Sequence, residues 1–118
     1  MSYSRNLLII FFYLIFFSLR AEVSNFEKGK NLFDNKKYDL AKFKFEKDIV
    51  YNPKNENSYL YLSKIFKLKK DDNQEEKNLK TVILLNPKNE EAILNLAFLE
   101  DDKETKVVTK YPYIKLLD

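Results

Sequence analysis

Pairs of adjacent acids are the residues of this chain whose types and spacing are best suited to chemistry. Two carboxylates that converge in a cleft can carry out general acid–base catalysis or bind a hard cation. An acid near the start of a helix is also stabilised by the helix dipole and by unpaired backbone amides. We expect all four pairs at helix starts or turns, so capping and solvation explain them better than a carboxylate enzyme, which stays a minor alternative. The pairs are Asp71-Asp72, Glu75-Glu76, Glu90-Glu91 and Asp101-Asp102.

Other residue types that catalytic sites need are absent or few. The chain has no Cys and no His, which removes thiol nucleophiles, zinc–thiolate sites and the usual near-neutral base. Its one glycine, Gly29, cannot form a glycine-rich phosphate loop. Both arginines, Arg5 and Arg20, lie in the first 21 residues, and without them 19 of the 21 cations remain, all Lys, against 18 acids. Nucleic-acid binding is therefore not expected, and neither is an enzyme, a metal site or a cofactor.

The first 21 residues have the organisation of an export signal. A short positive start is followed by an apolar run of 13 residues from Leu7 to Leu19, and then by the small residue Ala21. A signal-peptide core has roughly 7–15 apolar residues, whereas a membrane-spanning helix needs about 20. We predict a signal peptide or signal anchor at residues 1–21, and an exported chain that is periplasmic or lies on the extracytoplasmic face of the membrane. The alternatives are a membrane tether through residues 7–19 and a buried helix at the same place.

A five-residue sequence recurs in this chain at an offset of 34 residues. Residues 52–56, NPKNE, are identical to residues 86–90. A proline disfavours helical geometry in the residue before it and suits the first turn of the next helix, so Asn52 and Asn86 are predicted to end helices. The sequence thus predicts repeated helical hairpins. The same offset relates the small residues Gly29, Ser63 and Ala97 and the apolar residues Phe26, Leu60 and Leu94.

Hydrophobic spacing and turn residues predict an all-α chain. Helices are expected at residues 24–35, 38–51, 56–68, 74–85 and 90–100, and Ser24 with Glu27 is predicted to form a capping box at the first of them. Residues 101–118 are predicted to form a partial second helix, broken near Pro112. That segment would cover the apolar side of the last hairpin, as the end of a helical repeat array requires.

The positions that define the repeat are Gly29, Tyr38, Ala41, Phe45 and Pro53, then Ser63, Leu79 and Pro87, and finally Ala97. At these positions the chain resembles the tetratricopeptide repeat family, whose 34-residue unit is a helix–turn–helix with small residues where the helices cross. The resemblance covers about Val23 to Glu100 and implies a short α-solenoid of antiparallel hairpins over residues 22–118. It divides this domain into repeats at 22–55 and 56–89 and a partial third repeat with a cap at 90–118. Glu75 stands where the family places a packing Ala, which predicts a looser helix crossing in the second repeat.

The resemblance also implies a concave groove lined by the first helix of each repeat. An alternative is that Phe26, Leu60 and Leu94 serve as packing between helices. An apolar groove edged by lysines suits an acidic segment with apolar anchors. The groove residues that the resemblance implies are Phe26, Lys30, Phe33, Leu60, Lys64, Lys67, Leu94 and Phe98.

The function expected from these features is that of a non-catalytic protein- or peptide-binding adaptor or scaffold outside the cytoplasm. The main alternative is a membrane-tethered structural subunit of a larger helical assembly. Because about three repeats are usually needed for a stable array, self-association or a bound partner is expected to supply missing burial.

Overall fold

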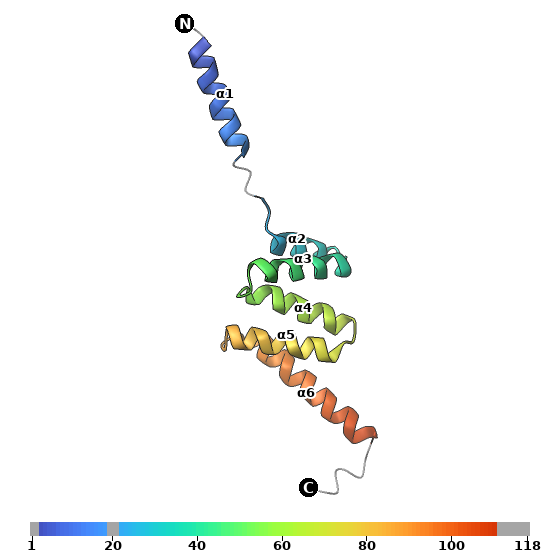
Figure 1. Cartoon of the computed structure of the whole chain (residues 1–118). Helices are drawn as coiled ribbons and strands as arrows, with labels where there is room; N and C mark the ends of the chain where they lie inside the picture. The colour runs from blue at the N-terminus through green and yellow to red at the C-terminus, as the bar shows by residue number, and fades with distance from the viewer. Residues whose placement is uncertain (1–2, 19–21, 111–118) are drawn as a thin grey trace.

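The computed structural model describes residues 3–18 and 22–110, and every regular element in these residues is a helix (Figure 1). The all-α prediction is confirmed for this part of the chain. Helices α2 to α6 are stacked in chain order, each packed against the next. The helices are α1 (Tyr3–Ser18), α2 (Asn25–Asp34), α3 (Tyr38–Tyr51), α4 (Glu56–Leu68), α5 (Asp72–Leu85) and α6 (Glu90–Lys110).

The two asparagines that precede proline end α3 and α5, as the sequence predicts. The backbone N–H of Asn52 donates to the Asp48 carbonyl at 2.7 Å, and that of Asn86 donates to the Val82 carbonyl at 2.8 Å. Helices α3 and α4 have the bounds expected from the sequence. The proline after each asparagine is therefore sufficient to place the ends of α3 and α5, the second helices of the two hairpins.

Side-chain caps fix the starts of α2 and α5. Ser24 Oγ accepts a hydrogen bond from the Glu27 backbone N–H at 3.1 Å, in agreement with the predicted cap. Asp71 Oδ1 accepts from the Gln74 backbone N–H, also at 3.1 Å. Because Asp71 is the N-cap, α5 begins at Asp72, two residues earlier than predicted.

The turns inside the two hairpins have the same backbone conformation. Lys36 and Lys70, 34 residues apart, have φ of 58° and 56°. In each turn the residue after the lysine donates its backbone N–H to the carbonyl five residues earlier, at 2.9 and 3.0 Å. Left-handed geometry is uncommon for lysine, so residue type alone did not reveal this second repeated feature.

Helix α6 is longer than predicted. It runs without a break from Glu90 to Lys110, so the expectation that it ends at residue 100 and that a separate helix begins at 101 is wrong. Residues 101–110 contain neither Gly nor Pro, and nothing in them ends a helix. Pro112 and the rest of the predicted cap, residues 111–118, lie outside the described residues.

Two groups of buried side chains hold α2 to α6 together. The first core joins α2, α3 and α4, and Gly29 of α2 packs directly on the Phe45 ring. The second core joins α4, α5 and α6. The first core consists of Ala41, Phe45, Leu62 and Ile65, and the second of Leu60, Leu79, Val82, Ala92 and Leu99.

Helix α1 exposes its apolar side chains, with Phe11 and Phe12 at 61% and 60% of their full accessibility. It has 16 residues. Within residues 3–18 and 22–110, no helix combines the length and the apolar character needed to cross a membrane. The prediction of a signal segment at residues 1–21 rests partly on residues 1–2 and 19–21, with Ala21 among them, which lie outside the described residues.

Candidate binding site

The structure separates the apolar groove candidates into packed and exposed residues. Phe26 and Phe33 join the first core, where their rings lie 5.9 and 5.1 Å from the Tyr61 ring. Leu60 is buried in the second core at 6% exposure. Leu94 and Phe98 of α6 are 57% and 66% exposed. Of these five residues, only the two on α6 present most of their surface to a ligand.

Exposure on α6 extends to one residue that was expected to pack between helices. Ala97, the third small residue of the repeat, is exposed, whereas Gly29 and Ser63 are buried. Gly29 is covered by Phe45 of α3, the second helix of its own hairpin. Helix α6 is the last described helix, so no described second helix covers Ala97.

The three lysines expected at the groove have different surroundings. Lys30 is exposed on α2. Lys64 pairs with Glu91 at 2.8 Å, and its Nζ lies 5.0 Å from the centre of the Tyr61 ring. Lys67 lines a cleft of about 610 Å³ between α4, α5 and α6. We call this hollow the α4–α6 cleft; it is lined by Lys67, Lys70, Asp72, Glu75, Phe98, Leu99, Asp102 and Lys106.

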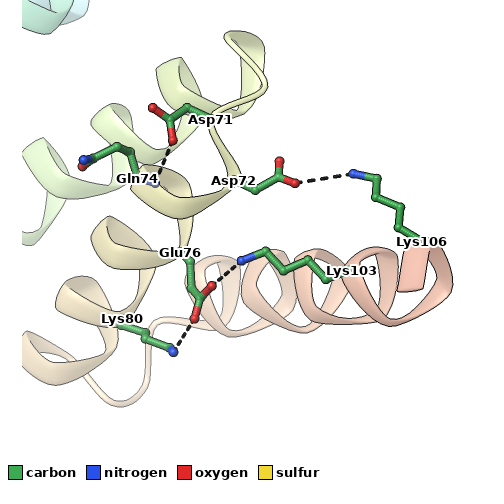
Figure 2. Close-up of polar contacts among 7 residues, drawn as sticks. All are labelled: Asp71, Asp72, Gln74, Glu76, Lys80, Lys103 and Lys106. Carbon is green, nitrogen blue, oxygen red and sulfur yellow. Dashed lines mark hydrogen bonds and ion pairs between the residues drawn. The ribbon is translucent and has the colours of Figure 1, made fainter. Parts of the chain in front are cut away.

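Ion pairs join α5 to α6 beside the α4–α6 cleft (Figure 2), and the pair of Asp72 with Lys106 is part of its lining. Lys106 Nζ lies 2.6 Å from Asp102 and 3.4 Å from Asp72. The hydrogen bond with Asp102 raises the pKa of Lys106, and Asp72 adds to this effect. Nearby, Glu76 pairs with Lys103. These contacts tie α6 to the start of α5 and leave Asp72 and Asp102 engaged with a lysine.

Glu75 is the one acid of the cleft lining that is buried, at 4% exposure. Burial raises the pKa of its carboxyl, and the nearby charge of Asp72 acts in the same direction, while Lys67 and Lys103 oppose it. A raised pKa means that the buried site favours the neutral carboxyl more than water does. Glu75 sits 34 residues from Ala41, the fully buried small residue of the first hairpin.

The expectation that all four acid pairs lie at helix starts or turns is wrong for one of them. The pair Asp101-Asp102 lies inside α6 because that helix does not end at residue 100. Glu75 lies in the first turn of α5, as expected, but its side chain is buried, so solvation does not explain it. Asp71 caps α5 and Glu90 begins α6, as expected.

Replacing Glu75 by Ala is expected to raise the free energy of unfolding by about 0.5–2 kcal/mol at neutral pH, because it removes a buried carboxylate. The pKa of Glu75 is raised in the folded state, so the wild type gains stability as pH falls from neutral toward the ordinary value of 4.5. The advantage of Glu75→Ala should shrink over that range. Urea denaturation of the wild type and of Glu75→Ala, at neutral pH and at pH 4.5, measures this difference in stability. Glu104→Ala, on the exposed surface of α6, is the control. A less stable Glu75→Ala chain at neutral pH would contradict the expectation.

Replacing Glu76 by Gln is expected to make stability less sensitive to acid. Hydrogen bonds from Lys103 and then Lys80 lower the pKa of Glu76 from 4.5 to about 2. A lowered pKa contributes stability above pH 4.5 that is lost as pH falls toward 2. The urea midpoint of Glu76→Gln should therefore start lower at neutral pH and fall less in acid. Curves parallel to those of the wild type would refute this, and Glu104→Gln is the matched control.

A buried polar cluster between α3 and α4 was not predicted from the sequence. Asp48 and Ser58 are 1% and 0% exposed, and Ser58 Oγ donates to Asp48 Oδ2 at 2.6 Å. A usable signal was present, because residues 34 positions later are Val82 and Ala92, which are apolar and fully buried. A polar residue that takes the place of a buried valine in the equivalent repeat position indicates a buried polar contact.

In the described part of the chain, no group of three or more His, Cys, Asp or Glu side chains is placed to hold a metal ion. Comparison of the chain with models of protein families, with curated proteins and with solved structures gave no match.

Proposed function

We propose that this chain is a non-catalytic adaptor outside the cytoplasm that binds an acidic, apolar-anchored peptide segment in the α4–α6 cleft. In this proposal residues 22–118 form a short tetratricopeptide-like solenoid, and residues 1–21 are its export signal. Support for the repeat comes from the matching turns at Lys36 and Lys70 and from the packing of each helix on the next. Support for the leader comes from the apolar run, of which residues 7–16 expose their side chains on α1.

The observation that carries the binding proposal is the exposed apolar surface of α6 beside two lysines. Phe98 lines the α4–α6 cleft at 66% exposure, and Leu94 lies one helical turn away on the same face. Among the described residues, neither Lys67 nor Lys70 has a carboxylate within 4.0 Å, although both line the cleft. A ligand with an apolar anchor and flanking carboxylates would cover the aromatic ring and pair these lysines.

A peptide-display selection against the full chain tests this proposal. We expect the enriched peptides to combine acids with large apolar residues. Their affinity should fall about tenfold or more with Phe98→Ala and with Lys67→Glu. Leu84→Ala is the matched control, since Leu84 is an apolar residue at 81% exposure on α5, outside the cleft. Peptides without acids, or equal losses for Phe98→Ala and Leu84→Ala, would refute the proposal.

A second candidate, a membrane-tethered structural subunit, is favoured by the exposed apolar side chains of α1. A retained α1 would hold the helices at a membrane, and the exposed α6 face would join a neighbouring subunit. Mass analysis of the mature chain distinguishes the two: cleavage after Ala21 supports an adaptor, whereas an intact N-terminus in a large complex supports the subunit. Within the α4–α6 cleft, the remaining alternative, a carboxylate enzyme, is left with Glu75, because Asp72 and Asp102 are paired with Lys106.

A further inference from the structure

The outer face of α3 combines apolar and basic side chains and contains no acid. Residues 40, 43, 44, 47, 50 and 51 fall within an arc of about 120° at 100° per residue. Four of these are large and apolar: Leu40, Phe43, Val50 and Tyr51 are 57%, 60%, 75% and 70% exposed. The other two are lysines, Lys44 and Lys47. We call these six residues the α3 face.

Lysines flank the α3 face at both ends of the helix, whereas on its α2 side Lys44 lines a hollow with both acids and lysines, Glu27, Asp34, Lys28 and Lys30. Lys36 and Lys37 precede α3 and Lys54 follows it, and all three are exposed. The acids of the helix point elsewhere. Asp39 pairs with Lys69 of the following hairpin, and Glu46 pairs with Lys42 at 2.6 Å.

Packing of the hairpin does not require the apolar residues of the α3 face. Helix α5 occupies the equivalent place in the second hairpin, and 34 residues after Leu40, Phe43 and Lys47 it has Gln74, Lys77 and Thr81. Only Leu84, the counterpart of Val50, is a large apolar residue that is mostly exposed. Because the second hairpin forms with polar residues at four of these six positions, the apolar and basic residues of the α3 face need another explanation.

A membrane surface rich in anionic lipid matches this combination of side chains. Helices that lie in a membrane interface place apolar side chains among the acyl chains and lysines among the headgroups. Stable attachment usually takes two signals. Seven backbone steps separate the end of α1 at Ser18 from the start of α2 at Asn25, a distance of at most about 25 Å, so an α1 lodged in a bilayer would keep the first hairpin close to it. This last argument rests on the proposed membrane segment, whereas the α3 face itself does not.

We propose that the α3 face is a membrane contact, which binds an anionic lipid surface through Leu40, Phe43 and Val50 with Lys44 and Lys47 at the headgroups. Lysines near an anionic surface each strengthen binding by about fivefold at low salt. The contact orients the first hairpin toward the membrane and turns the α3 face away from soluble partners.

A tryptophan reporter tests the proposal in the full chain, which has no Trp of its own. Phe43→Trp places the reporter on the α3 face, and Lys77→Trp places it at the equivalent position of α5. With phosphatidylglycerol vesicles, Phe43→Trp should shift its emission to the blue and be quenched by brominated acyl chains. Lys77→Trp should show neither effect. If both reporters are quenched alike, or neither is, the α3 face is not a membrane contact and the proposal fails.

Charge reversal separates this contact from any binding through α1. In the Phe43→Trp background, Lys44→Glu with Lys47→Glu should raise the lipid concentration needed for half-maximal quenching by at least about 25-fold. If α1 is inserted in the bilayer, the chain still sediments with the vesicles. Lys77→Glu with Lys80→Glu reverses the same number of charges on α5 and should leave quenching unchanged. Equal effects of the two double reversals would overturn the assignment to the α3 face. Zwitterionic phosphatidylcholine vesicles should give no quenching of Phe43→Trp.

Discussion

Asp48→Val combined with Ser58→Ala is expected to leave the chain within about 1 kcal/mol of wild-type stability, although each change alone is destabilising. Asp48→Val leaves the buried Ser58 hydroxyl without its acceptor, at a cost of about 1–3 kcal/mol. Ser58→Ala removes a hydrogen bond to a buried carboxylate, which costs about 1.5–3 kcal/mol. Replacing both partners by apolar groups removes the polar pair as a whole and can be nearly neutral.

The geometry around Asp48 explains why the two residues act as a unit. Ser58 Oγ and Asn55 Nδ2 both donate to Asp48 Oδ2, at 2.6 and 2.7 Å, and Asn52 Nδ2 donates to Oδ1 at 3.2 Å. The two asparagines are only partly buried or exposed, so water can replace their bonds to Asp48. Ser58 is fully buried and has no such replacement.

The second hairpin shows that the apolar version of this contact packs well. Val82 and Ala92 occupy the equivalent positions and are both 0% exposed in the second core. The asparagines of the repeated NPKNE sequence then take a different acceptor: Asn86 and Asn89 donate to Glu56 Oε1 at 2.9 and 3.2 Å. The asparagines of the two identical pentapeptides thus donate to different carboxylates, Asp48 in one case and Glu56 in the other.

Urea denaturation of the wild type, both single variants and the double variant measures the coupling. The matched control is the reverse exchange, Val82→Asp with and without Ala92→Ser. Val82→Asp alone buries an unpaired carboxylate, so it should be more destabilising than Val82→Asp combined with Ala92→Ser. If the loss in Asp48→Val with Ser58→Ala equals the sum of the single losses, the two residues are not a coupled pair.

Gly29→Ala is expected to destabilise the chain by about 1–3 kcal/mol, although alanine is favoured over glycine in helices by about 1 kcal/mol. A Cβ at this position would lie 2.8 Å from Phe45 Cε1, closer than packed carbon atoms approach. The Phe45 ring is fully buried and stacks on Tyr61 at a centroid distance of 5.0 Å, with Phe26 beside it. It therefore cannot move aside.

In the second hairpin the positions equivalent to Gly29 and Phe45 are Ser63 and Leu79, which are both buried. Phe45→Leu should therefore cost less in the Gly29→Ala background than in the wild type, by at least about 1 kcal/mol in a double-mutant cycle. Ala97→Gly is the control: Ala97 is exposed, so glycine there should cost only its helix propensity of about 1 kcal/mol. A Gly29→Ala chain more stable than wild type would show that the crossing is not tight.

The helical hairpins were predictable because local signals and packing agree in them. The proline after Asn52 and Asn86, the Ser24 cap and the apolar spacing of α3 all lead to the observed bounds. The length of α6 was not predictable from a repeat pattern, because the pattern requires a turn after residue 100 that the chain itself does not contain. The residues at 101–110, which contain no helix-ending signal, therefore determine the length of α6.

The site was less predictable, because burial depends on what covers a helix and not on its own sequence. Leu60 and Leu94 are the same residue type at equivalent positions, yet one is 6% and the other 57% exposed. Helix α4 is covered on both sides, by α3 and α5, whereas α6 follows α5 at the end of the described stack. The burial of Glu75 was missed for a similar reason, since an acid near a helix start usually faces water.

Site-specific photocrosslinking in the cell that makes this protein tests the proposed binding function most directly. A photoreactive amino acid is placed at Phe98, in the α4–α6 cleft, and in a separate chain at Leu84, which is more exposed but outside the cleft. We expect a discrete crosslinked product from position 98, mapped by mass spectrometry to an acidic segment with apolar residues, and none from position 84. No product from position 98, or the same products from both positions, would contradict peptide binding in the cleft.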